Sequence, residues 1–109
     1  MTLSTHVLDT MHGRPAAGIA VRLHRGEALL FESTTDADGR CPALRELAIV
    51  PGAYTIDFAV AEYFRGQGVS LPVPPFLDRV RVDFGISGDG HYHVPLLVSP
   101  FGYSTYRGS

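Results

Sequence analysis

The stretch 91–98 reads HYHVPLLV, and its alternation decides the fold prediction. Successive side chains of a β-strand point to opposite faces. One face then carries apolar side chains suited to a core: Tyr92, Val94, Leu96 and Val98. The other face carries two imidazoles about 7 Å apart beside apolar neighbours: His91, His93, Pro95 and Leu97. We therefore expect a strand covered on both faces, in which the missing N–H of Pro95 falls at an unpaired or irregular position.

The chain turns after this strand at residues 99–102 and ends with YSTYRGS. A chain terminus is usually frayed. Two aromatic rings and a guanidinium, those of Tyr103, Tyr106 and Arg107, make a docked tail the better expectation here.

Five further stretches alternate like strands: residues 3–9, 19–25, 28–34, 53–60 and 78–84. The turn at residues 25–27 makes two of them a hairpin. A short helix is expected within residues 61–67. The prolines of residues 69–76 favour an extended connection. Residues 85–90 are expected to form a turn. About seven short strands with at most one short helix predict an all-β, two-sheet antiparallel sandwich formed by a single domain, residues 1–109.

The polar loop of residues 35–40 reads TDADGR. Its D-x-D-G spacing resembles a calcium loop, but an EF-hand that starts at Asp36 needs a closing Glu where Leu47 stands. We therefore expect a turn held by Asp side chains, with Gly39 at a positive φ. Such a turn would direct Arg40.

Composition excludes several classes of protein. The net charge of −2 and the scattered basic residues give no electrostatic case for nucleic-acid binding. No apolar run is long enough to span a membrane, and the start, MTLSTHVLD, lacks the features of a secretory signal. Cys41 is the single cysteine, which rules out an intrachain disulfide. We expect a cytoplasmic protein.

Taken alone, His91 and His93 are ambiguous: the x-H-x-H spacing suits metal ligands, a proton-transfer pair or plain surface histidines. His6 would complete a set of three if its strand lay beside theirs. We interpret His12 and His24 as solvated, Asp57 as a surface charge, and Cys41 as a small buried or edge residue.

Two terminal motifs, LSTHVLDT at residues 3–10 and HYHVPLL with the final YRGS, together resemble the 5-hydroxyisourate hydrolases, the transthyretin-related enzymes of urate breakdown. The resemblance covers nearly the whole chain and implies a transthyretin-like sandwich. It implies hydrolysis of 5-hydroxyisourate to 2-oxo-4-hydroxy-4-carboxy-5-ureidoimidazoline.

The resemblance also implies the site. The expected catalytic residues are His6, Arg40, His93 and Ser109, and the expected substrate-binding residues are His6, Arg40, His91, Tyr106, Arg107, Gly108 and Ser109. It implies no cofactor and no required metal, although His6, His91 and His93 could collect a metal adventitiously. Which histidine is base and which is acid stays open.

The histidine face would expose Pro95 and Leu97 in a monomer, and exposed apolar surface of this kind marks an interface. The residues alone therefore predict self-association, and the resemblance implies a homotetramer, a dimer of dimers, with sites between subunits. The alternatives are a small-ligand carrier of the transthyretin type and a metal-binding or adhesive sandwich. The polar set His6, Arg40, His93 and Tyr106 favours a small oxygenated heterocycle over an apolar ring.

Overall fold

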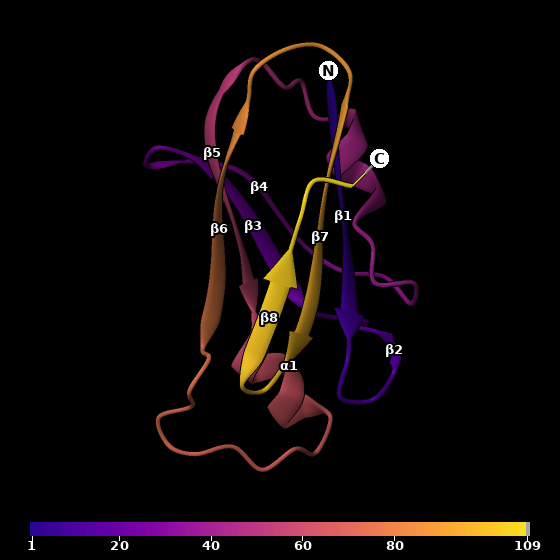
Figure 1. Cartoon of the computed structure of the whole chain (residues 1–109), viewed down its shortest axis with the longest axis vertical. Coiled ribbons are helices and arrows are strands. Elements are labelled where there is room, and N and C mark those ends of the chain that lie inside the picture. Colours follow the sequence, from indigo (N-terminus) through magenta and orange to yellow (C-terminus); the bar gives the residue numbers. More distant parts are fainter. Residues whose placement is uncertain (109) are drawn as a thin grey trace.

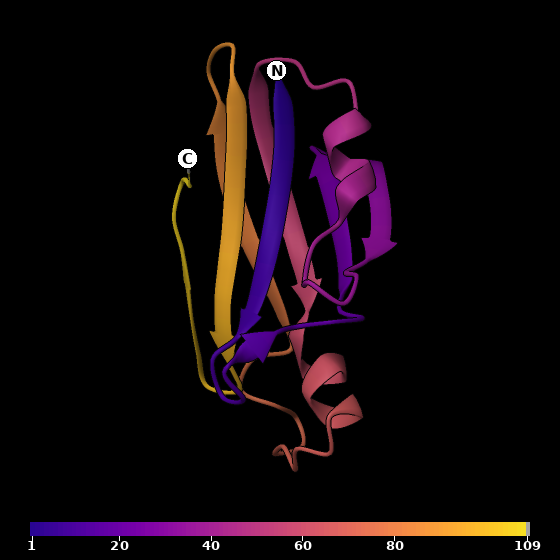
Figure 2. The ribbon, with the colours of Figure 1, turned by 90° about the vertical axis from the view of Figure 1, so that its right-hand side faces the viewer.

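A computed structural model describes residues 1–108 and shows two β-sheets packed face to face (Figures 1 and 2). The first sheet has the order β2 (Arg14–Pro15), β1 (Thr2–Asp9), β7 (His91–Ser99) and β8 (Gly102–Thr105). The second has the order β4 (Ala28–Thr34), β3 (Ala20–Arg25), β5 (Gly52–Ala59) and β6 (Arg79–Ile86). A 3₁₀ helix, η1 (Pro42–Glu46), and an α-helix, α1 (Val60–Gly66), lie between strands. The predicted all-β sandwich is confirmed.

The core lies between the two sheets and follows the predicted alternation. In β1 every second residue is buried, beginning with Leu3, and in β7 the predicted inward set of Tyr92, Val94, Leu96 and Val98 is buried. The second sheet contributes Tyr54, Ile56 and Phe58 from β5. Each large apolar side chain buried in this way contributes about 1.5–3 kcal/mol, so the inward faces of β1 and β7 fix which side chains face outward.

One pair of strands departs from the antiparallel expectation. β1 and β7 run parallel, with Thr2 opposite His91, Ser4 opposite His93 and His6 opposite Pro95. Only antiparallel strands can be joined by a tight turn, whereas parallel neighbours need a long connection. Here the whole second sheet intervenes between them in the sequence, yet β1 and β7 lie side by side (Figure 1).

The tail is docked, as predicted. β8 pairs with β7 from Ser99 to Leu96, and a separate bridge joins His93 to Gly108. Pro95 lies between these two paired segments, so its missing N–H coincides with a break in the ladder, as predicted. Its carbonyl accepts a hydrogen bond from Thr105 Oγ1 at 2.7 Å.

Most of the smaller expectations hold. The β3–β4 hairpin forms, Gly26 has a φ of +59° at its turn, and residues 69–76 form no strand. β6 instead continues to Ile86, two residues into the predicted turn, because it stays paired with β5 as far as Gly52. No helix within residues 1–108 is long and apolar enough to cross a membrane.

The prediction that Asp57 is a surface charge is wrong. Its side chain lies on the outer face of β5, yet the residue is only 3% exposed. Arg79 and Arg22 reach across from the two neighbouring strands and donate to Oδ1 at 2.5 and 3.3 Å. His24 Nδ1 lies 3.8 Å from Oδ2. A buried carboxylate requires such partners, and the two neighbouring strands β3 and β6 supply them.

His12 is less free than predicted. Its side chain is 27% exposed, but the ring nitrogen Nδ1 lies 2.6 Å from Oδ2 of Asp9. Asp9 is buried and also accepts hydrogen bonds from the His12 backbone N–H and the Tyr63 hydroxyl. These contacts tie the end of β1 to α1, so His12 serves the fold.

Candidate active site

The loop before Arg40 has the conformation that the sequence predicted. Oδ1 of Asp36 accepts the backbone N–H groups of Asp38 and Arg40 at 2.9 and 3.0 Å. Gly39 has a φ of +75° and its carbonyl accepts the N–H of Val7 at 2.8 Å. This contact places Arg40 as the bridge partner of His6, so the turn brings the guanidinium-bearing residue to the outer side of β1.

The outer face of β1 and β7 carries the three predicted histidines. His91 and His93 alternate with the buried residues of β7, and His6 alternates with those of β1. The parallel register sets Ser4 and His6 opposite His93 and Pro95. All three imidazoles are half-buried. The structure therefore brings together His6, Arg40, His91 and His93, from three separate parts of the sequence.

Hydroxyl groups link two of these imidazoles. Ser4 Oγ lies 2.7 Å from Nδ1 of His93 and 2.8 Å from Nε2 of His91. Thr2 Oγ1 lies 2.5 Å from Nδ1 of His91. Both ring nitrogens of His91 are therefore engaged, whereas no hydrogen bond to Nε2 of His93 is found within residues 1–108. The free nitrogen of His93 is the one available to water or substrate.

The site keeps this histidine neutral. Burial lowers the pKa of His93, and the positive charge of Arg40 lowers it further, with smaller contributions from His6, His91 and Arg45. Burial and then Arg45 lower the pKa of His91. A neutral imidazole at physiological pH can accept a proton, which is what a general base requires.

A cavity of about 200 Å³ is lined by Ser4, Thr5, Arg40, Cys41, Pro42 and Arg45. None of the three histidines lines it, but Ser4 contacts both His91 and His93. Two guanidinium groups in one small cavity offer planar donor pairs to carbonyl or oxyanion oxygens. Cys41 is buried, and that burial, with the nearby charge of Asp36, raises the pKa of its thiol to about 11. Cys41 therefore stays a thiol at neutral pH, which is the weakly nucleophilic form.

Two of the last described residues, Tyr106 and Gly108, lie on the histidine side of the sheet. The Gly108 N–H donates to the His93 carbonyl at 2.8 Å, and a Cβ at position 108 would lie 2.5 Å from Cδ2 of the His93 ring. Tyr106 is 59% exposed. The flanking pairs place it opposite Pro95, on the histidine side.

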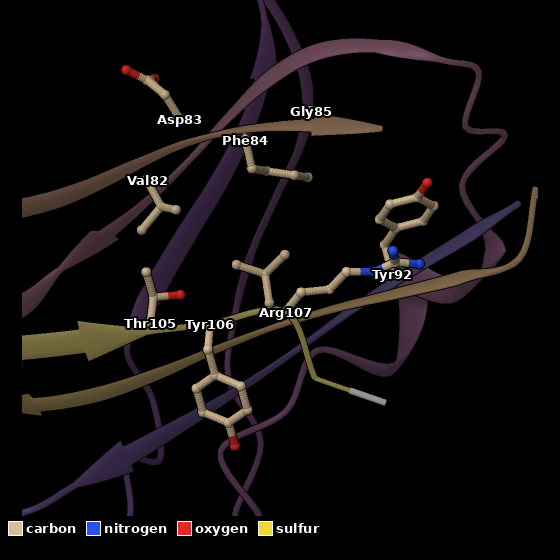
Figure 3. Close-up of a pocket in the computed structure, with 9 residues that line it drawn as sticks. Val82, Asp83, Phe84, Gly85, Tyr92, Thr105, Tyr106 and Arg107 are labelled. Atoms are coloured by element: carbon tan, nitrogen blue, oxygen red, sulfur yellow. The ribbon is translucent and has the colours of Figure 1, made fainter. Parts of the chain in front are cut away.

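Arg107 lies on the opposite side of the sheet. Its guanidinium carbon is 4.0 Å from the centre of the Tyr92 ring, a residue of the core face (Figure 3). Both line a cavity of about 240 Å³ at the open edge of the sandwich, between β6 and β8. The Tyr92 hydroxyl accepts the N–H groups of Ser87 and Gly88. The structure thus places the Arg107 side chain on the face of the sheet opposite His6, His91 and His93.

Ser109, which the sequence analysis expected to be catalytic and substrate-binding, lies outside the described residues. Within residues 1–108, no three His, Cys, Asp or Glu side chains gather where they could hold a metal ion, so His6, His91 and His93 do not form the adventitious set considered from the sequence.

Thr2, Ser4 and Arg45 belong to the site but were not predicted. The alternation of residues 3–9 already placed Ser4 on the face of His6, and the pairing of β1 with β7 was the missing information. Arg45 was considered as the rival of Arg40 and set aside because Arg40 follows the TDADG turn; its own stretch lacks clear periodicity and forms η1.

A two-sheet sandwich with a histidine- and arginine-lined outer face defines a transthyretin-like protein. Residues 3–108 match the HIUase/Transthyretin family, so the chain belongs to this family. It is 53% identical to the 5-hydroxyisourate hydrolase of Mesorhizobium japonicum, over 98% of this chain and 91% of the other.

Two solved structures show the same fold. A crystal structure of (S)-allantoin synthase superposes with a TM-score of 0.94 at 42% identity, where 99% of this chain covers 43% of a longer one. Sea bream transthyretin in complex with thyroxine gives a TM-score of 0.87 at 27% identity, over 99% of this chain and 95% of the other.

Proposed function

We propose that the chain hydrolyses 5-hydroxyisourate to 2-oxo-4-hydroxy-4-carboxy-5-ureidoimidazoline. The observation that carries the proposal is the convergence of His6, Arg40 and His93 on one outer face, where Nε2 of His93 has no hydrogen bond to any of residues 1–108. The name of the 53% identical relative supports the same activity. No cofactor is needed for this reaction, which adds water across a ring amide.

His93 is the proposed general base. Its lowered pKa keeps the imidazole neutral, and Nε2 can take a proton from water as it attacks the ring carbonyl. Such assistance contributes about 10²–10⁴-fold to the rate. His6, which contributes to the lowered pKa of His93, is placed to orient the substrate or to protonate the leaving nitrogen.

Arg40 is the proposed oxyanion stabiliser. It lines the cavity beside Ser4 and pairs with His6 along β1. Its guanidinium presents two parallel N–H donors to a planar, oxygen-rich ring and to the charge that develops on the attacked carbonyl. Arg45, in the same cavity, supplies a second cation for the remaining oxygens.

The tail completes the proposed site. Tyr106 and the terminal Ser109 would supply hydroxyl groups to place water or substrate. Gly108 lies against His93, and Arg107 anchors the tail from the other side of the sheet. We therefore assign Arg107 an anchoring role in place of the substrate contact expected from the sequence.

We also propose that the site lies between subunits of a homotetramer. The half-exposed Leu8 and Leu97 lie opposite each other on the histidine face. Apolar surface beside a catalytic site is covered by another copy in such an assembly, which also excludes water from the reacting groups. A cytoplasmic location remains part of the proposal.

The direct test follows the ultraviolet absorbance of freshly generated 5-hydroxyisourate, with and without the protein, before and after exhaustive chelation. Acceleration that survives chelation is expected. Loss of the acceleration on chelation would instead make the histidines metal ligands. If the protein caused no acceleration at all, the hydrolase proposal would fall and a transthyretin-type carrier would be the remaining reading.

A further inference from the structure

One hydroxyl group, that of Ser4, joins two imidazoles. Its Oγ lies 2.7 Å from Nδ1 of His93 and 2.8 Å from Nε2 of His91, whose Nδ1 lies 2.5 Å from Thr2 Oγ1. The register of β1 and β7 sets Thr2 opposite His91 and Ser4 opposite His93. An unbroken row of four groups, Thr2–His91–Ser4–His93, therefore runs along the outer face. We call it the hydroxyl–imidazole row.

If Ser4 donates to one imidazole and accepts from the other, proton counting allows this row two neutral orders. A neutral imidazole has one N–H donor and one bare nitrogen, and each hydroxyl has one proton to donate. In the first order, His93 Nδ1–H donates to Ser4, Ser4 donates to His91 Nε2, and His91 Nδ1–H donates to Thr2. In the second order, every one of these hydrogen bonds is reversed.

The two orders give Nε2 of His93 opposite roles in proton transfer. In the first order Nε2 of His93 is bare and can accept a proton. In the second order Nε2 carries a proton and can donate it. Hydrolysis of an amide needs both, because a proton leaves the attacking water and a proton must reach the departing nitrogen.

We propose that Ser4 is a proton-relay residue that couples His93 to His91 during hydrolysis. This inference rests on the proposed function. As water attacks, its proton bonds to Nε2 of His93 while the Nδ1 proton of His93 moves to Ser4. The Ser4 proton moves to Nε2 of His91, the Nδ1 proton of His91 moves to Thr2, and the Thr2 hydroxyl proton leaves to solvent. One proton enters the row and one leaves, so both imidazoles stay neutral.

The surroundings of the row favour this route over a charged imidazolium. Arg40, His6 and Arg45 all contribute to the lowered pKa of His93, and Arg45 contributes to that of His91. Charging either ring would place a further cation beside these groups. Thr2 is half-exposed near the chain start, so the far end of the row can exchange protons with solvent.

Kinetics of Ser4→Ala test the relay. The substitution keeps the strand but removes the link, so kcat should fall by at least ~10-fold while KM stays within ~2-fold, because acid–base assistance is lost and binding is not. Ser4→Thr keeps a hydroxyl and should recover kcat to within ~3-fold of wild type. Ser33→Ala, on β4 of the other sheet, removes a strand serine whose hydroxyl, among residues 1–108, donates to the Thr34 carbonyl alone, and it should change neither constant.

A proton inventory separates the relay from a merely structural role. The dependence of kcat on the D₂O fraction should be curved for wild type, since several protons move together, and linear for Ser4→Ala. A linear wild-type plot, or unchanged kcat in Ser4→Ala, overturns the proposal. An acyl adduct on Ser4 in the intact-mass spectrum during turnover would make Ser4 a nucleophile and would also overturn it.

A readout without turnover keeps this inference distinct from the proposed function. The ¹⁵N chemical shifts of labelled histidines report which ring nitrogen carries the proton. Introduced into the wild-type background, His91→Gln should shift the nitrogen signals of His93. Introduced into the Ser4→Ala background, the same substitution should leave them unchanged. Coupling present in a protein that does not act on 5-hydroxyisourate would refute the hydrolase alone, and absence of coupling would refute the relay alone.

Discussion

Gly108 lies flat against the ring of His93: its N–H donates to the His93 carbonyl at 2.8 Å, and an added Cβ would lie 2.5 Å from Cδ2. A real Cβ cannot approach that closely, so Gly108→Ala must displace either the tail or the imidazole. We expect kcat/KM to fall by about 10–100-fold, as misplacement of a reacting group does, with little change in melting temperature.

Gly102→Ala is the matched control for this substitution. It lies in the same C-terminal segment, and its nearest contact would be an ordinary 3.9 Å to Ser99 Oγ. Equal losses of activity in the two variants would show that the whole segment, and not the contact with His93, is sensitive to an added methyl group.

The Arg107–Tyr92 contact predicts an indirect effect on activity. The guanidinium lies 4.0 Å from the ring centre, and a cation at this distance stabilises by about 0.5–1 kcal/mol at an exposed site. Arg107→Met should loosen the tail and lower kcat about 5–10-fold, whereas Arg107→Lys should keep most of the rate. Faster amide hydrogen exchange at Gly108 in Arg107→Met would locate the effect. If Arg107→Met raised only KM, Arg107 would be a substrate ligand.

Arg40 should govern the titration of His93. The pKa of His93 is lowered from 6.5, first by burial and then by Arg40. The neutral base therefore persists below pH 6.5, and the acidic limb of kcat/KM should fall below that value. Arg40→Gln removes one cause, so the pKa of His93 should rise toward 6.5. An NMR titration of the His93 ring measures this without turnover, and an unchanged or lower pKa in the variant contradicts the placement of Arg40.

Asp9 should make stability depend on acid pH. Burial raises its pKa, but hydrogen bonds from the His12 ring, the His12 N–H and the Tyr63 hydroxyl outweigh burial and hold the pKa below 3.8. Because the folded pKa is the lower one, this stabilisation is complete above pH 3.8 and is lost as the pH falls through the folded pKa.

The same network predicts the effect of Tyr63→Phe. Its hydroxyl donates to Asp9 Oδ2 at 2.8 Å, and losing one hydrogen bond to a buried carboxylate costs about 1.5–3 kcal/mol. Urea unfolding at pH 7 should show this loss, with a smaller difference between the two proteins below the folded pKa of Asp9. An equal difference at every pH would mean that the ring packing, and not the carboxylate, is affected.

Local patterns predicted much of the fold. The alternation in residues 91–98 gave the correct inward-facing set, and the Asp–Gly loop gave the correct turn before Arg40. The expectation that a monomer exposes Pro95 was wrong, because Pro95 is buried on the histidine face. Both depend on side chains a few residues apart, for which strand and turn geometry leave few choices.

Long-range placement was less predictable. Whether Ser4 meets His93 depends on the parallel pairing of the two chain ends, which no local pattern encodes. Asp57 is buried because arginines arrive from β3 and β6. Arg107 falls on the core face because the tail continues the register of β8, as the bridge at Gly108 shows.

The most direct test of the central claim compares initial rates of 5-hydroxyisourate loss for wild type, His93→Ala and His24→Gln in one assay. His24 is a half-buried strand histidine of the other sheet, beside Asp57. We predict that His93→Ala loses at least ~100-fold in rate, the scale of general-base assistance, and that His24→Gln stays near wild type, with both variants folded. Near-normal turnover by a folded His93→Ala protein would contradict the account.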